Sequence, residues 1–587
     1  MSPGQAMLKL DFANAFNTVR RDSLLECVSR AAPSIYPFVY ATYANETPLF
    51  YGSETLWSAE GVQQGDSLGP LLFSLVTLPL LTTCQLPLKF GYLDDITMGS
   101  DLHSLDTALS QLRTEALDLG LVLNDSKCEI ICSAADSHSL PTQFNRFLVV
   151  PALKASLLGV PLSTADALTD ALAKRVSSLE FMTTRLRLLQ AQDATLILRH
   201  SFSTPFIQHL LRGILCADNP LLQVYDDKMR TALSQTLNIK LEDFAWQQAT
   251  LPIRAGGLGV RSAVLLSTSA FLSSVRGAAD LTGLILNNAA ALHSDPLVQQ
   301  ASQIWSRQAG ANNSSASVSQ PALQKSWDKV LVDASYQTLV QSAADEYSRA
   351  RLLALAAPHA GDWLKVTPVS SLGLRLDNEG MRIATGLRLG ANLCMPFSCI
   401  CGKQVDARGA HGLSCIKSAG RQSRHALVND TMLRAFSKAG VPVTREPSGL
   451  IPGSSLRPDG CSIIPWSQGK CIAWDVTCPD TLAASSVSGS AITAGHAAEH
   501  ASNAKRMKYQ QLQSSHYFAP IAIETLGAIN EEAIELLNAL GSRIIAKTGD
   551  SRERMFLYQQ LSMAVQRGNI ACFTGSLRQE HFAIHDE

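Results

Sequence analysis

The hydrophobic pattern in the first hundred residues predicts strands that end at carboxylates. Residues 7–10 form a largely apolar, strand-like run that leads into Asp11 and then into a helix-compatible stretch. Residues 90–98 place apolar positions on both sides of Asp94 and Asp95, which is typical of two strands joined by a tight turn. The pattern predicts a β-hairpin with the acidic pair at its tip.

Most of the remaining chain has helical patterning. A glycine-punctuated loop at residues 61–67 opens an apolar helix, and prolines and threonines interrupt the apolar stretch 68–88, which predicts a core helix rather than a membrane span. Leucines recur at roughly helical spacing within residues 163–259, with arginines between them. A small, polar stretch at 306–320 predicts a flexible linker, and helical patterning resumes over 321–357.

The two adjacent aspartates need a physical reason to stand side by side. Their carboxylates repel each other, and Asp-Asp is a poorer hairpin turn than Asn-Gly or Asp-Gly. A divalent cation would offset the repulsion, because Mg²⁺ binds carboxylate oxygens and keeps other positions for water and phosphate. Taken alone, Asp94-Asp95 is more typical of a solvated acidic turn, so the interpretation depends on the surrounding motifs.

Five blocks, in order along the chain, resemble the reverse transcriptases of non-LTR retrotransposons. They lie at residues 7–17, at the Gln-Gly loop 61–73, at the Tyr-Leu-Asp-Asp sequence 92–95, at 119–127 and at 157–162. In that family the first strand's aspartate and the hairpin pair hold two metal ions, and the Gln-Gly loop cradles template and incoming nucleotide. The resemblance therefore implies that two Mg²⁺ bind three catalytic carboxylates, those of Asp11, Asp94 and Asp95.

The same resemblance implies substrate-binding roles for four more residues. Gln64 and Gly65 belong to the loop. Phe16 lies five residues after Asp11, where the family places a bulky aromatic that would clash with a ribose 2′-hydroxyl; core packing is the alternative. Lys127 matches a lysine near the triphosphate, a proton donor to the leaving pyrophosphate, and a solvated lysine is the alternative there.

The resemblance also predicts a missing part. Residues 1–6 alone precede the first strand, whereas a complete reverse transcriptase of this type has a fingers region there, with basic residues that grip the triphosphate. We therefore expect a chain that lacks the fingers, either as a truncated element or as a remnant that survives in another role.

A second group of candidate ligands follows the helical region. Three thiols and one imidazole fall in a C-x-C-x9-H-x3-C arrangement that suits tetrahedral Zn²⁺, at Cys399, Cys401, His411 and Cys415. The C-x-C spacing is tighter than usual, so Cys394 and His425 remain substitutes for any one ligand. Reduced cysteines in a loop are the alternative to a zinc knuckle.

Downstream of this group, acidic residues and lysines follow the order used by restriction-like nucleases. Glu446 comes first, then Asp459 in a Pro-Asp pair, then Asp475 on an apolar strand, and finally Lys505 and Lys508. In such a site the two aspartates would hold at least one Mg²⁺ that activates water, and a lysine would steady the developing charge.

The sequence departs from the plain nuclease pattern at Thr477, where a lysine would normally follow the strand aspartate. Non-LTR elements with a zinc knuckle upstream and the lysine displaced to a following helix are more similar to this chain. Lys505 and Lys508 are three residues apart and share a helix face, so the choice between them stays open. Glu524 resembles a later acidic landmark of the same domain.

The overall charge of the chain does not by itself indicate nucleic-acid binding. The net charge is −1, which is low for a nucleic-acid-binding protein, but residues 1–160 sum to −7 and residues 399–510 to +6. Thirteen scattered cysteines fit a reducing compartment, and there is no secretory signal pattern, so we expect an intracellular, nuclear or cytoplasmic protein without a membrane partner.

These observations predict a multidomain α+β protein. The expected order is palm (1–162), helical thumb (163–305), flexible linker (306–320), helical connector (321–390), zinc knuckle (391–430) and α/β restriction-endonuclease-like domain (431–587). The expected activity is RNA-directed DNA polymerisation coupled to DNA nicking, with an RNA template, a DNA target and primer, and deoxynucleoside triphosphates. The alternatives are a non-catalytic nucleic-acid-binding remnant, or an active endonuclease beside an inactive polymerase.

Overall fold

The structure, a computed structural model, describes residues 4–286, 295–310 and 318–577. It divides into two compact units. The first is Met1–Ala171 with Val275–Gln299, and the second is Leu172–Ser274 with Gln300–Glu587. No helix in the described ranges is long and apolar enough to cross a membrane.

A five-stranded sheet organises the first unit, in the order β4-β5-β1-β6-β7. The pairs β4–β5, β5–β1 and β1–β6 are antiparallel, and β6–β7 is parallel. Alternate residues of β1 and β5, among them Leu8, Leu10, Ile96 and Met98, are buried in one core. The strands are β1 (Gln5–Leu10), β4 (Leu88–Tyr92), β5 (Asp95–Asp101), β6 (Glu129–Cys132) and β7 (Leu148–Pro151).

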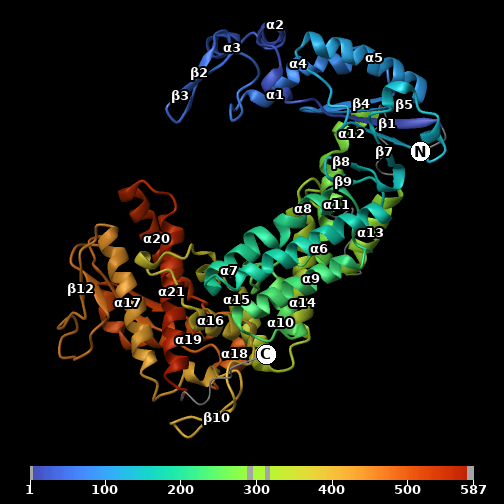
Figure 1. The fold of residues 1–587 in the computed structure, drawn as a ribbon. Coiled ribbons are helices and arrows are strands. Elements are labelled where there is room, and N and C mark those ends of the chain that lie inside the picture. The colour runs from blue at the N-terminus through green and yellow to red at the C-terminus, as the bar shows by residue number, and fades with distance from the viewer. Residues whose placement is uncertain (1–3, 287–294, 311–317, 578–587) are drawn as a thin grey trace. The chain divides into compact units, whose positions relative to one another are not determined.

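Helices cover one face of this sheet (Figure 1). The helix α4 packs against β4, α5 packs against β1 and β5, and α2 packs on α4. The described segments of this unit outside the sheet include α1 (Ala15–Thr18), α2 (Arg21–Ala31), α3 (Tyr36–Tyr43), α4 (Gly69–Thr83), α5 (Leu102–Asp118), α12 (Ala279–Leu286), the hairpin β2 (Thr47–Tyr51) and β3 (Glu54–Ser58), and the short pair β8 (Ser156–Leu157) and β9 (Val160–Pro161). The expected core helix after the Gln-Gly loop is therefore α4.

The acidic hairpin differs from its prediction in one detail. Tyr92 pairs with Asp95, so the two-residue loop is Leu93-Asp94 and not Asp94-Asp95. Leu93 adopts a left-handed φ of 59°, the sign that the first position of such a turn requires. The register is fixed by the burial of Ile96 rather than by the turn residues, because a slip of one position would expose it.

The second unit begins with helices that occupy most of the predicted thumb and connector. They are α6 (Asp166–Leu186), α7 (Ala191–Ile197), α8 (Thr204–Gly213), α9 (Leu221–Leu237), α10 (Asp243–Thr250), α11 (Ala263–Gly277), α13 (Pro296–Ala309), α14 (Gln324–Gln341), α15 (Glu346–Ala356) and α16 (Asn378–Leu389). Residues 166–171 of α6, 275–277 of α11 and 296–299 of α13 belong to the first unit. Residues 306–309 of the expected linker are the end of α13, and residues 311–317 of it lie outside the described residues. The amphipathic spacing of α13 continues through residues 306–309, so the polar side chains there did not mark the end of the helix.

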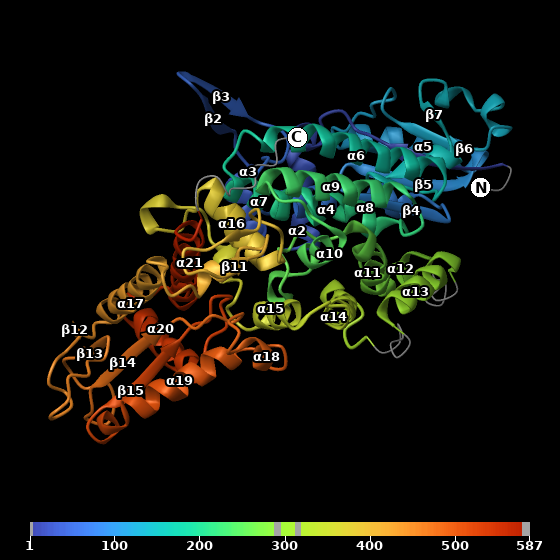
Figure 2. The same cartoon turned by 90° about the horizontal axis from the view of Figure 1, so that it is seen from below.

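The C-terminal part of this unit is a four-stranded sheet between helices (Figure 2). The order is β12-β13-β14-β15, with β12–β13 and β13–β14 antiparallel and β14–β15 parallel. The elements here are β10 (Phe397–Ser398), β11 (Gln404–Val405), α17 (Gly420–Lys438), β12 (Val443–Arg445), β13 (Gly460–Ser462), β14 (Ile472–Thr477), α18 (Val487–Ser490), α19 (His496–Lys508), β15 (Tyr517–Ala522), α20 (Glu531–Thr548) and α21 (Glu553–Thr574).

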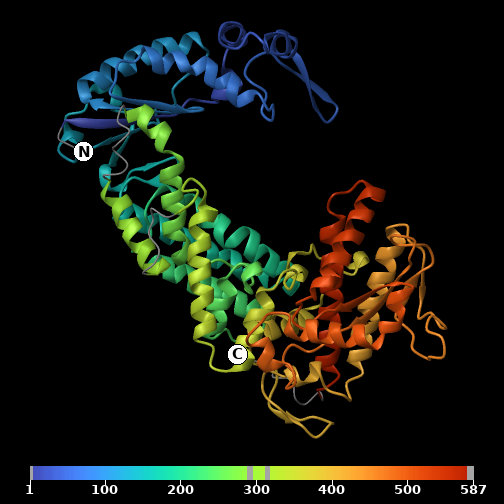
Figure 3. The same cartoon turned by 180° about the vertical axis from the view of Figure 1, so that it is seen from behind.

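The predicted boundary near residue 390 is not a break in this unit. The last helix, α21, red in Figure 3, packs against α17 and α20 and also against α16, which precedes that boundary. The backbone N–H of Trp363 donates to Ser562 Oγ at 3.2 Å, and Arg567 donates to the carbonyl of Arg375 at 3.0 Å. The chain returns to cover the connector, which glycine and proline positions along the sequence could not reveal.

Candidate functional site

The strand register brings the three predicted palm aspartates together. Leu10 pairs with Ile96 in the β1–β5 ladder, and the next step of that register sets Asp11 opposite Asp95. Residues directly opposite in an antiparallel pair lie about 4.5–5.5 Å apart. Asp94 is the neighbouring turn residue. Burial raises the pKa of Asp95, and the charges of Asp94 and Asp11 raise it further.

Neighbouring strands and loops hold Asp11 in place. Its carbonyl accepts a hydrogen bond from the backbone N–H of Asn124 at 2.8 Å, and its N–H donates to Cys128 Sγ at 3.4 Å. Lys9 lies two residues earlier on β1, hence on the same face, and its Nζ lies 2.7 Å from Glu129 on β6. Lys9 was not singled out from the sequence, although its spacing of two from Asp11 was a usable signal.

The Gln-Gly loop forms a turn at the start of α4. Gln64 and Gly65 are exposed, and Gly65 has a φ of 97°, which a side chain would rarely allow. The neighbouring Asp66 anchors the loop, because its carboxylate accepts hydrogen bonds from the hydroxyl of Tyr43 at 2.5 Å and from the N–H of Leu68 at 2.9 Å. Gln64 also lines a cavity of about 690 Å³ beside the β2–β3 hairpin.

The other two predicted substrate contacts have different surroundings. Phe16 is half-buried and stacks on Phe73 of α4, with ring centroids 4.4 Å apart and an interplanar angle of 11°. The ring of Phe16 therefore packs against the core of this unit, which is the alternative that the sequence left open to a contact with the sugar of the nucleotide. Lys127 is exposed in the turn before β6.

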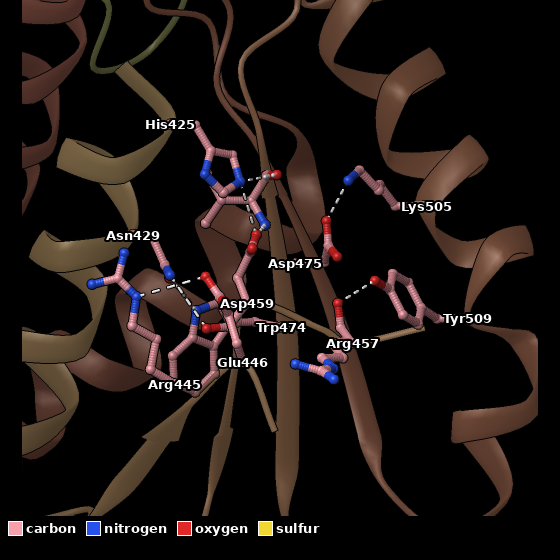
Figure 4. A network of polar contacts seen from close by, with 11 residues as sticks. His425, Asn429, Arg445, Glu446, Arg457, Asp459, Trp474, Asp475, Lys505 and Tyr509 are labelled. Carbon is pink, nitrogen blue, oxygen red and sulfur yellow. Dashed lines mark hydrogen bonds and ion pairs between the residues drawn. The ribbon is translucent and has the colours of Figure 1, made fainter. Parts of the chain in front are cut away.

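In the C-terminal sheet, two predicted nuclease carboxylates lie on neighbouring strands (Figure 4). Gly460 of β13 pairs with Trp474 of β14, so Asp459, which directly precedes β13, lies near the part of β14 that carries Asp475. The charges of both carboxylates act on His425. The side chain of Trp474 is buried against α17, where its ring stacks on Phe436 at 4.5 Å. Because strand side chains alternate, Asp475 points to the opposite face, toward α19.

The geometry separates the two candidate lysines. Lys505 Nζ makes an ion pair with Asp475 Oδ1, and the side chain of Asp475 is 4% exposed. Lys508 is exposed, and its ammonium lies 4.8 Å from the ring centroid of Tyr509. A helix turns by about 100° per residue, so a spacing of three leaves enough angular difference to send only one of the two ammonium groups into the site.

His425 joins this network from α17. Asp459 Oδ2 accepts hydrogen bonds from the N–H of Val476 at 2.6 Å and from His425 Nε2 at 3.0 Å. His425 Nε2 also lies 3.2 Å from the carbonyl oxygen of Val476, so this nitrogen carries a proton in either contact. The hydrogen bond to Asp459 is the main cause that raises the pKa of His425. Its place beside Asp459 removes His425 from the set of zinc-ligand substitutes.

The remaining acidic candidates are peripheral. Glu446 is exposed at the end of β12, and its N–H donates to the carbonyl of Asp459 at 3.2 Å. Glu524 is fully buried and accepts hydrogen bonds from Thr481 Oγ1 at 2.8 Å and from the N–H of Ala498 at 3.0 Å. Burial raises the pKa of Glu524. These contacts tie the start of α19 to the sheet.

The predicted zinc ligands converge. Their four ligand atoms, on Cys399, Cys401, His411 and Cys415, all lie within 4.8 Å of one another. The Sγ atoms of Cys399 and Cys415 are 3.7 Å apart. Tetrahedral Zn–S bonds of about 2.3 Å require sulfur atoms about 3.8 Å apart, so the donor set fits Zn²⁺. Cys394 Sγ instead contacts the backbone carbonyl oxygens of Asp406 and Ala407, at 3.6 and 3.5 Å.

Purified, reduced protein is expected to bind about one Zn²⁺, and Cys401→Ala with His411→Ala is expected to lose it, because two of four ligands are then missing. Metal content by mass spectrometry measures this. Cys471→Ala is the matched control, because Cys471 lies outside the group. Full zinc occupancy in the double variant would show that other residues bind the metal.

Comparison with known proteins agrees with the geometry of the first unit. Residues 2–162 match the family model described as "Reverse transcriptase (RNA-dependent DNA polymerase)". Residues 2–162 carry a reverse-transcriptase domain. The five-stranded sheet with its acidic hairpin lies entirely within this domain, as do Phe16, Gln64, Gly65 and Lys127.

Beyond the reverse-transcriptase domain, one curated relative matches a longer stretch. The "Retrotransposable element SLACS 132 kDa protein" of Trypanosoma brucei gambiense is 24% identical over 474 residues, which covers 77% of this chain and 35% of the relative. The chain thus spans about a third of that protein's length. A solved structure of telomerase from Candida albicans matches with a TM-score of 0.24 and 10% identity, over 58% of this chain and 49% of that one.

Proposed function

We propose that this chain is the polymerase and endonuclease part of a non-LTR retrotransposon protein, which nicks DNA and copies RNA from the exposed 3′-hydroxyl. The observation that carries the proposal is the meeting of Asp459, Asp475 and Lys505 in a chain whose residues 2–162 carry a reverse-transcriptase domain. The substrates in this proposal are an RNA template, a DNA target that becomes the primer, and deoxynucleoside triphosphates.

In the polymerase centre, Asp11, Asp94 and Asp95 would hold two Mg²⁺. The three carboxylates carry like charges that repel one another, and their oxygens are hard ligands. A bound divalent cation would therefore stabilise the group. Bound Mg²⁺ lowers the pKa of the primer 3′-hydroxyl and neutralises the leaving pyrophosphate. The chain's own contribution is position: the β1–β5 register holds Asp11 against the hairpin, and the Gln64-Gly65 turn offers exposed polar groups to template and nucleotide.

In the endonuclease centre, Asp459 and Asp475 would hold at least one Mg²⁺. Bound Mg²⁺ activates water and stabilises charge on the phosphate. The Lys505 ammonium, already beside Asp475, would steady the charge that develops as the phosphodiester is cut. The backbone N–H of Val476 and Nε2 of His425 fix the orientation of the Asp459 carboxylate.

A comparison of the two lysines tests this assignment. Lys505→Ala is expected to slow Mg²⁺-dependent nicking of supercoiled DNA by about 10²–10³-fold, the usual loss when one group that stabilises transition-state charge is removed. Lys508→Ala, on the same helix and exposed, is expected to leave nicking within about twofold. Equal rates for the two variants would contradict the assignment of Lys505. Absence of nicking in the unaltered protein would favour a nucleic-acid-binding role without catalysis.

A further inference from the structure

A buried guanidinium in the second unit has no carboxylate partner. Arg351 of α15 is 2% exposed. Its Nη1 donates to Gln248 Oε1 at 2.6 Å and to the carbonyl of Arg388, while its Nε is buried without a hydrogen-bond partner among the described residues. An unpaired buried charge is costly, and burial is the first cause that lowers the pKa of Arg351 to about 10.

A second buried guanidinium lies close to the first. Arg388 of α16 is 2% exposed and donates only to backbone carbonyls, those of Gly257 at 3.1 Å, Ile253 at 2.9 Å and Ala360 at 3.4 Å. Burial and the charge of Arg351 lower the pKa of Arg388 to about 9. Within the described part of the chain, no carboxylate forms an ion pair with either arginine, so this region holds an excess of positive charge.

Arg351 lies at the wall of a cavity of about 510 Å³. Gly390 lines the same cavity with a φ of 66°, and a Cβ there would stand 2.7 Å from Arg351 Nε, so the guanidinium lies against the glycine backbone. Lys240 and Arg408 line the cavity as well, and Glu242 is the carboxylate among its lining residues. Three cations therefore line the cavity with one carboxylate, and a second carboxylate, that of Asp345, pairs with Arg408 beside it.

The cavity is built from several separate segments, and Arg351 and Arg408 are each held by side-chain contacts. Arg408 comes from the loop between Cys401 and His411, and its guanidinium lies 4.9 Å from the ring centroid of Tyr347 and 3.6 Å from Asp345. The contacts of Arg351 Nη1 with Gln248 and with the carbonyl of Arg388 have a structural role, because they hold the C-terminal end of α16. That role does not explain the unpartnered Nε of Arg351, and the contacts of Arg408 with Asp345 and Tyr347 do not explain why Lys240 lines the same cavity.

We propose that this cavity, whose lining includes none of the proposed metal ligands, is a phosphate-binding site of the helical region. Arginine forks match phosphate oxygens in geometry and charge, and a volume of 510 Å³ falls within the range of pockets that hold small ligands. The phosphate is either a phosphodiester of a bound nucleic-acid strand or a free phosphate. The proposal does not depend on polymerase or nuclease activity, so a binding assay tests it alone.

The test uses variants at the edge of the cavity, because loss of Arg351 would also release the end of α16. Lys240→Gln with Arg408→Gln removes two cations, and Arg349→Gln, exposed on the same helix as Arg351, is the matched control. Zinc content serves as a folding control, because Arg408 lies within the knuckle loop. The probes are a fluorescent 12-nucleotide oligothymidylate, followed by anisotropy across a salt series, and inorganic phosphate, followed by thermal shift.

A phosphodiester ligand predicts that the double variant raises the Kd of the oligonucleotide by about tenfold and lowers the salt dependence of log K by about one to two, relative to Arg349→Gln. A free phosphate ligand predicts instead that inorganic phosphate raises the Tm of the unaltered protein and of Arg349→Gln but not of the double variant, with oligonucleotide binding unchanged. Identical behaviour of the double variant and Arg349→Gln with both probes would overturn the proposal.

Discussion

Asp475→Asn is expected to reduce Mg²⁺-dependent nicking of supercoiled DNA by more than about 100-fold, because even residues behind a metal's direct ligands contribute about 10–100-fold. The substitution keeps the side chain's shape, and Lys505 is 25% exposed, so water can solvate the ammonium that loses its partner. We therefore expect the free energy of unfolding to change little. DNA binding should stay within about twofold, because phosphate contacts come mainly from basic side chains.

Asp459→Asn is expected to have the same effect, because the carboxylates of Asp459 and Asp475 lie close enough together for both charges to act on His425. Asp430→Asn is the matched control, because the half-exposed carboxylate of Asp430 on α17 pairs with Arg445 at 3.1 Å. The conversion of supercoiled to open circular DNA measures the rate. Nicking that survives both Asp459→Asn and Asp475→Asn would place the cutting site elsewhere in the protein.

Asp11→Asn is expected to produce the second large effect, a loss of more than about 100-fold in deoxynucleotide addition to a DNA 3′-end on an RNA template, on the same reasoning about metal ligands. Asp11 faces the acidic hairpin across β1 and β5, so no neighbouring carboxylate can replace it without changing the register. Asp22→Asn is the control, because Asp22 is exposed and paired with Arg20. Incorporation of labelled nucleotide measures the rate.

A second readout makes this prediction independent of turnover. Mn²⁺ can stand in for Mg²⁺ at oxygen ligands, and its electron paramagnetic resonance signal reports bound ions. We expect Asp11→Asn to weaken Mn²⁺ binding that Asp22→Asn retains. Unchanged incorporation and unchanged Mn²⁺ binding in Asp11→Asn would together contradict the assigned polymerase centre.

The hydrophobic pattern of the sequence correctly predicted the strands that carry the palm aspartates. The apolar run before Asp11 is β1, and the apolar positions around the acidic pair are β4 and β5. The turn itself was shifted by one residue. Turn position depends on which strand face is buried, and the burial of Ile96 is set by helices elsewhere in the chain. The identity of candidate ligands was thus easier to predict than the register that arranges them.

Long-range packing was the part that the sequence could not show. Spacing placed Lys505 and Lys508 on one helix face, but the packing of α19 against β14 decides which of them meets Asp475. His425 precedes Asp459 by 34 residues and reaches it only because α17 packs over the sheet. The return of α21 to α16 likewise has no local signal.

The central claim is that the nick made in one centre supplies the primer used in the other. The direct measurement is the covalent transfer of labelled deoxynucleotide to the nicked strand, with intact target DNA, RNA template and Mg²⁺ in one reaction. With a protein that carries a reverse-transcriptase fingers segment upstream of residue 1, we expect transfer. On intact DNA we expect none when that protein also carries Asp475→Asn or Asp11→Asn. On DNA that is nicked in advance, Asp475→Asn should recover transfer and Asp11→Asn should not. Transfer by Asp475→Asn on intact DNA, or failure of pre-nicked DNA to restore it, would contradict the coupling.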